Sequence, residues 1–341
     1  MNILAIESSC DETSAAVVKN GTVILSNVIA SSSAMHEKYG GIVPEVASRE
    51  QLKCILPTIQ EALLQAHCTY DSIDAIAVTI GPGLIGSLLI GVETAKTIAF
   101  VTGKPIIPVN HVLAHIYANF LNSQLSIINY QFPAIALVVS GGHTELFLMN
   151  NARELQWLGG TIDDAAGEAF DKTARLLGFG SRGGLAIQEV SRSEILLRRT
   201  GKKSCMKLPR PLIHDDTLNF SFSGLKTAIM REWQKNPKHD KQLVSTLAYE
   251  VQESITDVLV SKTIHAAQQY DAKSILIGGG VASNIRLREK FKSSTINFFC
   301  PPVALCTDNA ACIGSYAFFR GTAVDWHTIE ATPNLSVEIT E

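Results

Sequence analysis

The residues best able to do chemistry are two histidines, His111 and His115, in the run Asn110-His-Val-Leu-Ala-His-Ile-Tyr-Ala-Asn-Phe120. Residues four apart on a helix project from one face, so both imidazoles can share one cation. A metal also needs a ligand from elsewhere, and the candidate is Asp308, in Cys306-Thr-Asp-Asn-Ala-Ala311. Two histidines and one aspartate leave coordination positions open for a substrate. The alternative, commoner for an isolated pair, is that the histidines only cap or pack a helix.

The elements that position these residues come from a chain of 341 residues, which is long enough for two domains. Because 46% of the residues are hydrophobic and only 18% are charged, the chain can bury a large core. Polar or glycine positions interrupt every apolar run before about 18 residues, so we expect no membrane span. The first residues, Met-Asn-Ile-Leu-Ala-Ile-Glu7, lack a basic segment and predict a strand, which disfavours a signal peptide.

Cysteine usage and net charge narrow the classes further. The seven cysteines are odd in number and show no C-x-x-C spacing, which predicts reduced thiols in a cytoplasmic protein. The pattern fits neither a disulfide framework nor a structural zinc site. The 29 basic and 32 acidic residues give a net charge of −3, which argues against strong, unaided binding of nucleic acid.

The first part of the chain predicts strands that alternate with helices. Extended runs cover residues 3–8, 15–18, 23–28, 75–80 and 105–109. Asn20-Gly21 is a hairpin signal between the second and third runs. Helices are expected at 44–67, broken or kinked at Pro57, then up to about residue 101, and around the two histidines.

A second cycle of the same kind begins near Pro133. Strands are expected at 134–139, 145–149 and 274–277, and helices at 164–177, at 243–269 and from 285. The shared element order predicts two related α/β domains facing a central cleft. We place the first domain at residues 1–125 and the second at 126–305. Residues 306–341 supply a helix that packs back on the first domain, and a tail.

Three strand-to-turn junctions, at residues 8–14, 140–144 and 278–284, are candidates for ligand binding. The second and third contain glycines, which let a backbone approach a phosphate or carboxylate closely. Three such junctions in a chain with two α/β domains favour a nucleotide or acyl-adenylate site. None is a Walker A loop or a G-x-G-x-x-G loop.

Acidic and basic side chains suggest further roles. Asp11 and Glu12, at the first junction, are candidates for acid–base chemistry or cation binding, with turn or capping roles as the alternative. Asp171 lies on an expected helix and could receive ligand hydroxyls. The segment Arg192 to Arg210 holds seven basic residues against one acid, Glu194. It is either an RNA contact or a solvated basic loop.

Nine motifs in order resemble the tRNA threonylcarbamoyladenosine (TsaD) family, in its bacterial branch, once called O-sialoglycoprotein endopeptidase. Besides the His111-x-x-x-His115 pair they are Ile6-Glu-Ser-Ser-Cys-Asp-Glu-Thr13, Gly40-Gly-Ile-Val-Pro-Glu-Val-Ala-Ser-Arg49, Gly81-Pro-Gly-Leu-Ile-Gly86, Val138-Val-Ser-Gly-Gly-His-Thr-Glu145, Gly167-Glu-Ala-Phe-Asp-Lys172, Phe220-Ser-Phe-Ser-Gly-Leu-Lys226, Gly279-Gly-Val-Ala-Ser-Asn284 and Cys306-Thr-Asp-Asn-Ala310. Together they cover residue 1 to about 320.

The resemblance implies the actin-like ATPase and sugar-kinase fold. It also implies that His111, His115 and Asp308 hold one divalent metal per chain, usually described as iron, with zinc as the alternative. The implied contacts of the threonylcarbamoyl-adenylate are Val138, Val139, Ser140, Gly141, Gly142, Asp171, Gly184 and Asn284. One loop departs from the family: Ser181-Arg-Gly-Gly-Leu185 stands where Tyr-Pro-Gly-Gly-Pro is usual, and Gln188 replaces a commonly acidic residue.

The implied activity is transfer of threonylcarbamoyl from threonylcarbamoyl-AMP to N6 of adenosine 37, in tRNAs that read codons beginning with A. Implied partners are tRNA, an inactive TsaB-like paralogue and a small TsaE-like ATPase. Within the basic segment, Arg198, Arg199, Lys202 and Lys203 are our candidates for tRNA contact. Two alternatives are a metal-dependent glycoprotein endopeptidase and an ATP-binding interaction module. Zincin peptidases use H-E-x-x-H, whereas Val112 occupies the glutamate position here.

Overall fold

The computed structural model describes residues 1–36, 39, 41–121, 130–180, 183–199, 206–236 and 240–338, with only the backbone for 197–199. The expected boundary between the two domains, at residue 125, lies outside these residues. The chain forms two compact units. The first contains Met1–Gln131, Met149–Gln156 and Pro301–Glu341, and the second contains Phe132–Leu148 and Trp157–Cys300.

The first unit is built on a five-stranded mixed sheet. Its order is β3 (Val23–Ser31), β2 (Glu12–Lys19), β1 (Asn2–Glu7), β4 (Ala75–Gly81), β5 (Ile106–Asn110). Strands β1, β2 and β3 pair antiparallel, whereas β1, β4 and β5 pair parallel. The predicted hairpin is confirmed: Asn20 and Gly21 have φ of 52° and 69°, the left-handed backbone that a tight β-turn requires.

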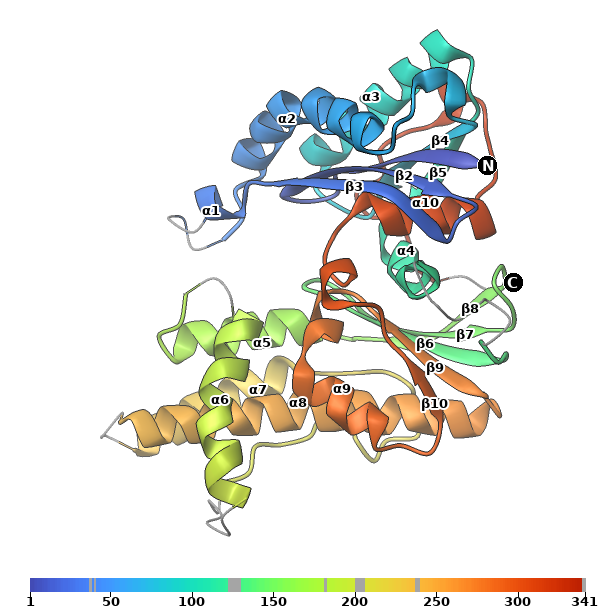
Figure 1. Cartoon of the computed structure of the whole chain (residues 1–341). Helices are drawn as coiled ribbons and strands as arrows, with labels where there is room; N and C mark the ends of the chain where they lie inside the picture. Colours follow the sequence, from blue (N-terminus) through green and yellow to red (C-terminus); the bar gives the residue numbers. More distant parts are fainter. Residues whose placement is uncertain are drawn as a thin grey trace. The chain divides into compact units, whose positions relative to one another are not determined.

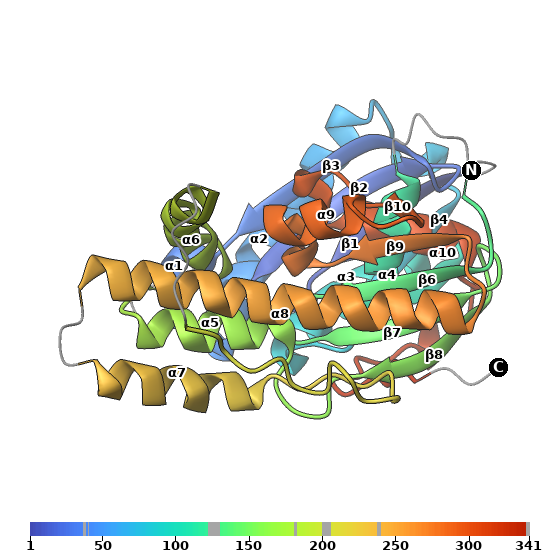
Figure 2. The same ribbon diagram turned by 90° about the horizontal axis from the view of Figure 1, so that it is seen from below.

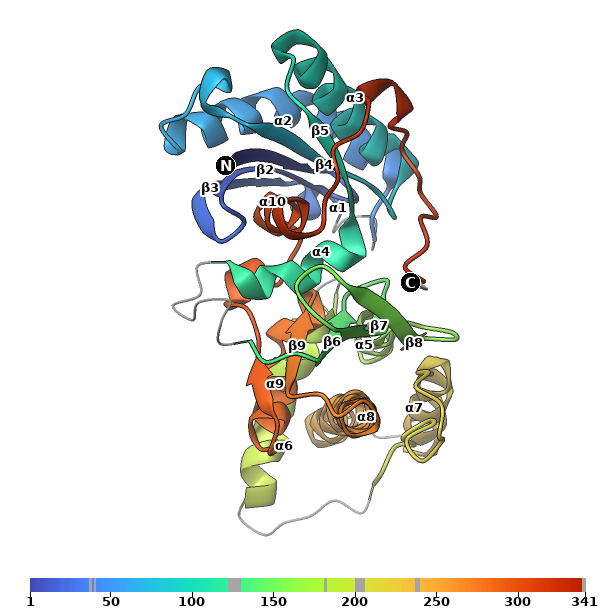
Figure 3. The ribbon, with the colours of Figure 1, turned by 90° about the vertical axis from the view of Figure 1, so that its right-hand side faces the viewer.

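Helices cover both faces of this sheet. Helices α2 (Pro44–Gln65) and α3 (Ile85–Thr102) pack on one face, and α10 (Ala310–Phe319) packs on the other, as Figures 1 and 3 show. Smaller helices are α1 (Ser33–His36), α4 (His111–Tyr117), η2 (Tyr70–Ser72), η3 (Ala118–Phe120), η6 (Val303–Leu305) and η7 (Trp326–Thr328).

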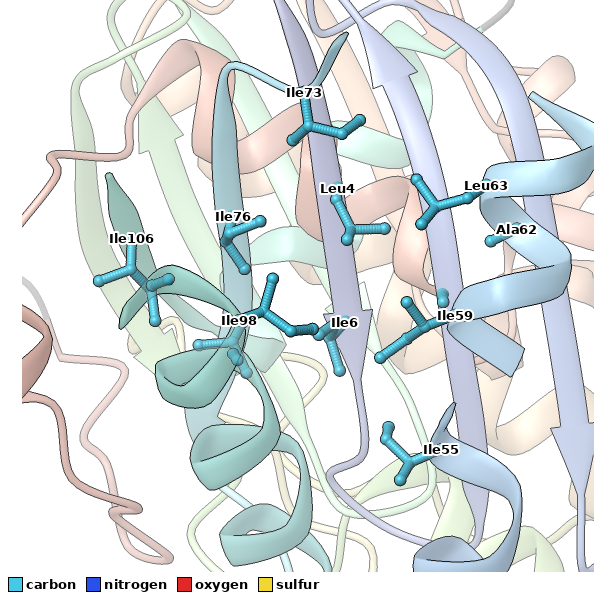
Figure 4. Packing of buried hydrophobic residues seen from close by; sticks show 14 of the residues in the cluster. Leu4, Ile6, Ile55, Ile59, Ala62, Leu63, Ile73, Ile76, Ile98 and Ile106 are labelled. Atoms are coloured by element: carbon cyan, nitrogen blue, oxygen red, sulfur yellow. The ribbon is translucent and has the colours of Figure 1, made fainter. Parts of the chain in front are cut away.

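The core between the sheet and α2 and α3 is aliphatic (Figure 4). Ile55 and Ile59 of α2 face Leu4 and Ile6 of β1 from either side of Pro57. Of the expected break or kink at Pro57, the break is wrong: burial on both sides keeps α2 in one piece despite the hydrogen bond that proline removes. The kink stays a prediction.

Helix α3 alone among the described helices is long and apolar enough to cross a membrane, judged by length and composition. Its buried face, which includes Val92, Ala95 and Ile98, belongs to the same aliphatic core. Such packing is typical of a core helix in a globular domain.

The second unit repeats the strand plan of the first. Its sheet order is β10 (Asn297–Phe299), β9 (Ser274–Gly278), β6 (Ala134–Val139), β7 (Thr144–Met149), β8 (Leu155–Gly160), with β9 parallel to β6 and β10. Listed from β8, this sheet contains the third, second, first, fourth and fifth strands of its unit, numbered along the chain. The sheet of the first unit, listed from β3, has the same order. The expected relation between the two halves is confirmed.

The helices of this unit are α5 (Ala166–Leu176), α6 (Gly183–Arg199), α7 (Ser223–Lys235), α8 (Lys241–Gln269), α9 (Ile285–Lys292) and η5 (Gly280–Ser283). Figure 2 shows α8 running the length of the unit, with α5 alongside. Strands β8 and β10 and helices α6 and α7 were not predicted. The loop alternative for the basic segment is wrong for its first part, because Arg192 to Arg199 continue α6.

Candidate metal centre and substrate loops

The short helix α4 starts immediately after β5, and Asn110 fixes its start. The Asn110 side-chain oxygen accepts hydrogen bonds from the backbone N–H groups of Val112 (3.0 Å) and Leu113 (3.3 Å). Its amide donates to the carbonyl of Ser336 in the C-terminal tail (3.1 Å). Capping satisfies amides that a helix start leaves unpaired, so the position of the first turn, which carries His111, is well defined.

Asp308 reaches the histidines because α10 packs against α4, β1 and β2. Asn309 caps α10, accepting from the N–H groups of Ala311 (3.1 Å) and Cys312 (3.3 Å). The N–H of Ala310 donates to Oγ of Ser14 on β2 (2.9 Å). These bonds anchor the start of α10 and, with it, the preceding aspartate.

The three predicted ligands come together in the first unit. Oδ1 of Asp308 lies 3.7 Å from Nε2 of His111 and 3.4 Å from Nε2 of His115. Each residue offers one ligand atom, and these atoms all lie within 4.8 Å of one another. Ligands at about 2.0–2.2 Å from one ion would stand about 3–4 Å apart, so small side-chain movements suffice.

His115 supplies the test of whether this set fits a metal. Its side chain is 1% exposed, and neither ring nitrogen forms a hydrogen bond with the described part of the chain. A buried polar atom without a partner costs free energy, which a bound cation would recover. The donor set, two imidazoles and one carboxylate, suits iron or zinc.

Sequence reasoning missed a fourth buried group, Glu7 at the end of β1. Its Oε2 lies 3.0 Å from Nδ1 of His111, and Ser9 Oγ lies 3.2 Å from the same nitrogen. Thr79 donates to Oε2 (2.6 Å) and the N–H of Ser9 donates to Oε1 (2.6 Å). The only signal in the sequence is a carboxylate ending a buried apolar strand.

The charges in this cluster shift each other's protonation. Burial by itself lowers the pKa of His111, but the negative charges of Glu7 and Asp308 outweigh it and raise that pKa to about 9. Burial by itself raises the pKa of Glu7, but the charge and hydrogen bond of His111 outweigh it, so that pKa is lowered. The pair is stabilised in its charged form when no cation is bound.

Asp11 and Glu12, the predicted acid–base residues, lie at the start of β2. Oε1 of Glu12 accepts a hydrogen bond from Oγ of Ser31 (2.8 Å). Burial, followed by the charge of Asp11, raises the pKa of Glu12 to about 8. The amide of the buried Gln51 donates to the carbonyls of Cys10 (2.9 Å) and Glu12 (3.0 Å), which holds this turn.

The predicted adenylate contacts gather within the second unit. Gly279 (φ +89°) leaves room for the carbonyl of Val139, which would lie 2.4 Å from an added Cβ. Gly167 at the start of α5 leaves the same room for the carbonyl of Ser140. Gly183 is equally tight against Asp171, whose pKa burial raises. Glycines therefore let the segment 138–142 lie close to Gly279 and to the start of α5, and let the start of α6 lie close to Asp171.

At the exposed positions of these loops a ligand has space. An added Cβ at Gly141, Gly142 or Gly184 would meet nothing within 4 Å. Asn284 caps α9, its oxygen accepting from the N–H of Leu287 (3.0 Å). Next to Asn284, a cavity of about 240 Å³ is lined by Gln188, Arg192, Ile195, Gln252, Ile285 and Arg286.

The family model for tRNA N6-adenosine threonylcarbamoyltransferase (TsaD) matches residues 23–315. The chain belongs to this family. A relative so named from Clostridium botulinum (strain Kyoto / Type A2) is 48% identical over 99% of this chain and 98% of its own length. Others so named are 47% identical (Syntrophomonas wolfei; 93% and 92% covered) and 45% identical (Persephonella marina; 96% and 93% covered).

Solved structures agree with the predicted actin-like fold. Full-length HypF has a TM-score of 0.62 at 12% identity, covering 93% of this chain and 46% of that one. Component A of the Acidaminococcus fermentans (R)-2-hydroxyglutaryl-CoA dehydratase has a TM-score of 0.53 at 15% identity, with 93% and 98% covered. At such identities the likeness concerns the fold alone.

Membership of the TsaD family makes this chain a transferase of tRNA modification and does not favour the endopeptidase alternative. A feature of α4 also disfavours that alternative. Val112, in the position of the zincin glutamate, is fully buried in α4 and carries no group that can activate water.

The basic segment is only partly described. The side chains of Arg198 and Arg199 and all of Lys202 and Lys203 lie outside the described residues. Arg210 pairs with Glu250 (3.2 Å) and Asp257 (3.1 Å), so its charge is compensated within the second unit. Ser181 and Arg182 of the departing loop also lie outside, whereas Gly184 begins α6 with Gly183.

Proposed function

We propose that this protein transfers threonylcarbamoyl from threonylcarbamoyl-AMP to N6 of adenosine 37, in tRNAs that read codons beginning with A, and releases AMP. The observation that carries the proposal is the convergence of His111, His115 and Asp308 in a member of the TsaD family. A protein that only interacts with others would have no use for a buried imidazole without hydrogen bonds.

His111, His115 and Asp308 would hold one divalent metal, iron by the resemblance or zinc by the same donor set. When bound, such an ion would act as a Lewis acid, binding oxygens of the threonyl moiety and polarising the carbamoyl carbonyl. The donor is a mixed anhydride and already activated, so the chain need not hydrolyse ATP for the transfer. Because the adenine amine is a weak nucleophile, orientation of the two substrates dominates the rate.

The loops of the second unit would bind the adenylate. Val138 to Gly142 expose backbone at two open glycines, which suits a phosphate, and Gly184 is open in the same way. Asp171 would accept hydrogen bonds from hydroxyl groups. The 240 Å³ cavity beside Asn284 offers apolar walls from Ile195 and Ile285 to a flat ring.

Asp11 and Glu12 are the proposed residues for proton transfer. The incoming amine must lose a proton as the new bond to the carbamoyl carbon forms, and AMP leaves with the electron pair of the broken bond. With its pKa raised to about 8, Glu12 is a stronger base than an ordinary carboxylate, and its ionised fraction, which grows as the pH approaches 8, can take up the proton.

The partners proposed are tRNA, a TsaB-like paralogue and a TsaE-like ATPase, in the cytoplasm. A net charge of −3 is poorly suited to holding tRNA alone, so an assembly would add basic surface. Helices α2 and α3 also leave large apolar side chains exposed: Leu52, Leu56, Leu64, Leu89, Phe100 and Val101. We take these side chains, on two helices that contact each other, as the proposed contact surface for a partner.

Incubation with synthetic threonylcarbamoyl-AMP and tRNA tests the function. We expect modified adenosine and stoichiometric AMP, with the partners increasing turnover. ATP hydrolysis by the isolated chain, together with no transfer when the partners are added, would instead identify an ATP-dependent interaction module. Multiple turnovers at full rate by the isolated chain would refute the need for partners.

A further inference from the structure

Glu7 is a buried carboxylate that no part of the proposed reaction uses. It is 1% exposed, and three groups converge on it: Nδ1 of His111, the hydroxyl of Thr79 and the N–H of Ser9. Thr79 lies on β4, the strand beside β1, so two neighbouring strands fix this carboxylate. A carboxylate buried so completely is retained only where its partners stabilise it.

We infer that Glu7 is a positioning residue that holds His111 for the metal, an inference that rests on the proposed metal centre. By accepting from Nδ1–H at 3.0 Å, Glu7 selects the tautomer whose Nε2 lone pair is free. That Nε2 is the nitrogen on the side of Asp308, 3.7 Å from Oδ1. Carboxylates behind metal-bound histidines fix ring orientation and increase ligand basicity.

The two histidines differ in this respect. His115 forms no hydrogen bond with the described residues, so its orientation depends on packing and on the cation. His111 is the pre-oriented member of the pair. The site would therefore be half formed before any ion binds, and Glu7 would be the origin of that order.

Glu7→Gln is the decisive variant because all the groups around Glu7 can donate. A glutamine has one acceptor oxygen, so its NH2 must face a donor, either Ser9 or the Thr79 and His111 pair. Thr79→Val is the matched control: it removes one donor and leaves the contact with His111. Zn²⁺ affinity is measured for each by chelator competition, and the His111 tautomer by nitrogen NMR of the Zn²⁺-loaded protein, which shows whether Nε2 or Nδ1 binds the ion.

We expect Glu7→Gln to weaken Zn²⁺ binding by about 10- to 100-fold and to alter the His111 tautomer, as loss of such an outer carboxylate does elsewhere. Thr79→Val should keep the wild-type tautomer. A folded Glu7→Leu protein, in which Nδ1 of His111 has lost this acceptor altogether, overturns the inference if its Zn²⁺ affinity is that of the wild type. Failure of the proposed function is recognised separately, as a wild-type protein that binds Zn²⁺ but transfers nothing.

An independent observation in the second unit concerns Gln252 of α8, which is completely buried. Its amide donates to Oγ of Ser191 on α6 (2.9 Å), and its oxygen accepts from Nδ2 of Asn284 (3.2 Å). Because the Asn284 oxygen already caps α9, this asparagine has one N–H left for a ligand.

We propose that Gln252 positions Asn284 so that Asn284 meets the adenylate only as a hydrogen-bond donor. This rests on the proposed function, which gives Asn284 its ligand. Gln252 also lines the neighbouring cavity, so its amide joins α6, α8 and α9 where the ligand would bind. The remaining N–H of Asn284 would then select a hydrogen-bond acceptor on the ligand: a phosphate oxygen, a ring nitrogen or a sugar oxygen.

AMP itself is the probe. Gln252→Leu should weaken AMP binding in calorimetry about tenfold, which corresponds to about 1.4 kcal/mol. It should raise the KM for threonylcarbamoyl-AMP while leaving kcat and Zn²⁺ affinity near wild type. Gln252→Glu keeps the acceptor for Asn284 and should bind AMP better than the leucine variant. Ser191→Ala, which leaves the Asn284 contact intact, is the control for the packing of α6.

Unchanged AMP affinity in a folded Gln252→Leu protein overturns this proposal, as does an equal loss in Ser191→Ala. A wild-type protein that binds AMP without any transfer would count against the proposed function instead.

Discussion

Nε2 of His115 lies 3.4 Å from Oδ1 of Asp308, although the two residues belong to distant parts of the chain. The packing of α10 on α4 produces this approach. It leaves the histidine buried, without hydrogen bonds to the described residues, beside a carboxylate. Such an arrangement is unfavourable in an empty core and favourable around a cation, which is why we take it as the centre of the site.

Replacement of His115 by alanine should remove the metal. Two ligands are too few for tight binding of a divalent transition metal, so we expect the metal content to fall from about one ion per chain to background. Elemental analysis of purified protein measures this. His327→Ala is the control, because that histidine is exposed and pairs with Asp325. Full occupancy in His115→Ala would refute the assignment of the site.

Sequence reasoning succeeded where chemistry depends on local spacing. The rings of His111 and His115 lie next to each other, as their spacing predicts, while their role as ligands stays a prediction. The hairpin at Asn20-Gly21 and the strand 134–139 were found as expected. These features follow from short-range rules: helical periodicity, left-handed turn residues and continuous burial. Asp308 was named as the candidate third ligand from its residue type, and the family resemblance supported it, since no local pattern links it to the histidines.

The remainder depends on packing that one sequence does not display. Glu7 looks like any polar residue at a strand end until β4 and α4 lie beside it. Strand β10 has three residues, too few for a periodic signal. Helix α6 opens with two glycines, which usually argue against a helix. The domain boundaries at 125 and 305 stay predictions, which limited proteolysis would test.

The cap of α4 should contribute measurably to stability. Asn110→Ala removes two capping hydrogen bonds and the contact with Ser336, so we expect a loss of about 1 kcal/mol in the free energy of unfolding. Zn²⁺ affinity should fall as well, because the first turn of α4 carries a ligand. Denaturant titration and chelator competition measure the two effects. Asp325→Ala, which removes the cap of the distant η7, should leave Zn²⁺ affinity unchanged.

Stability at acidic pH should depend on Glu253 of α8. Burial alone would raise its pKa, but hydrogen bonds from Arg286 (2.6 and 3.1 Å) and the charge of Lys290 outweigh burial and lower it. A carboxyl whose pKa is lower in the folded state stabilises the protein above its unfolded-state pKa. That contribution is lost as the pH falls through the folded-state value.

Glu253→Gln should therefore reduce the free energy of unfolding at pH 7 by about 2 kcal/mol, the scale of hydrogen bonds to charged groups. The difference from wild type should shrink on going from about pH 5 to pH 3, because the wild-type carboxyl then takes up a proton. Denaturant titrations across this range measure it. Glu232→Gln, in a surface pair with Lys235, should show little effect at any pH. A pH-independent difference for Glu253→Gln would contradict the argument.

The basic segment remains the proposed tRNA contact in a narrower form. Arg210 is paired with two carboxylates and Arg192 lines the cavity beside Asn284, so neither is a good candidate for phosphate binding. Five basic residues of the segment remain, and of these the predicted contacts are Arg198, Arg199, Lys202 and Lys203, at the end of α6 and beyond it, whereas Lys207 was not among them.

Replacing these four residues with alanine should weaken tRNA binding and flatten its salt dependence. Each phosphate contact releases counterions, so the slope of log affinity against log salt should fall by up to about one unit per lost contact. AMP affinity should not change, because the adenylate loops are untouched. A variant with four other exposed lysines replaced controls for net charge: Lys19, Lys53, Lys235 and Lys241. If both variants show the same small loss and an unchanged slope, the segment contributes only net charge, and the phosphate contacts belong to another surface or to a partner.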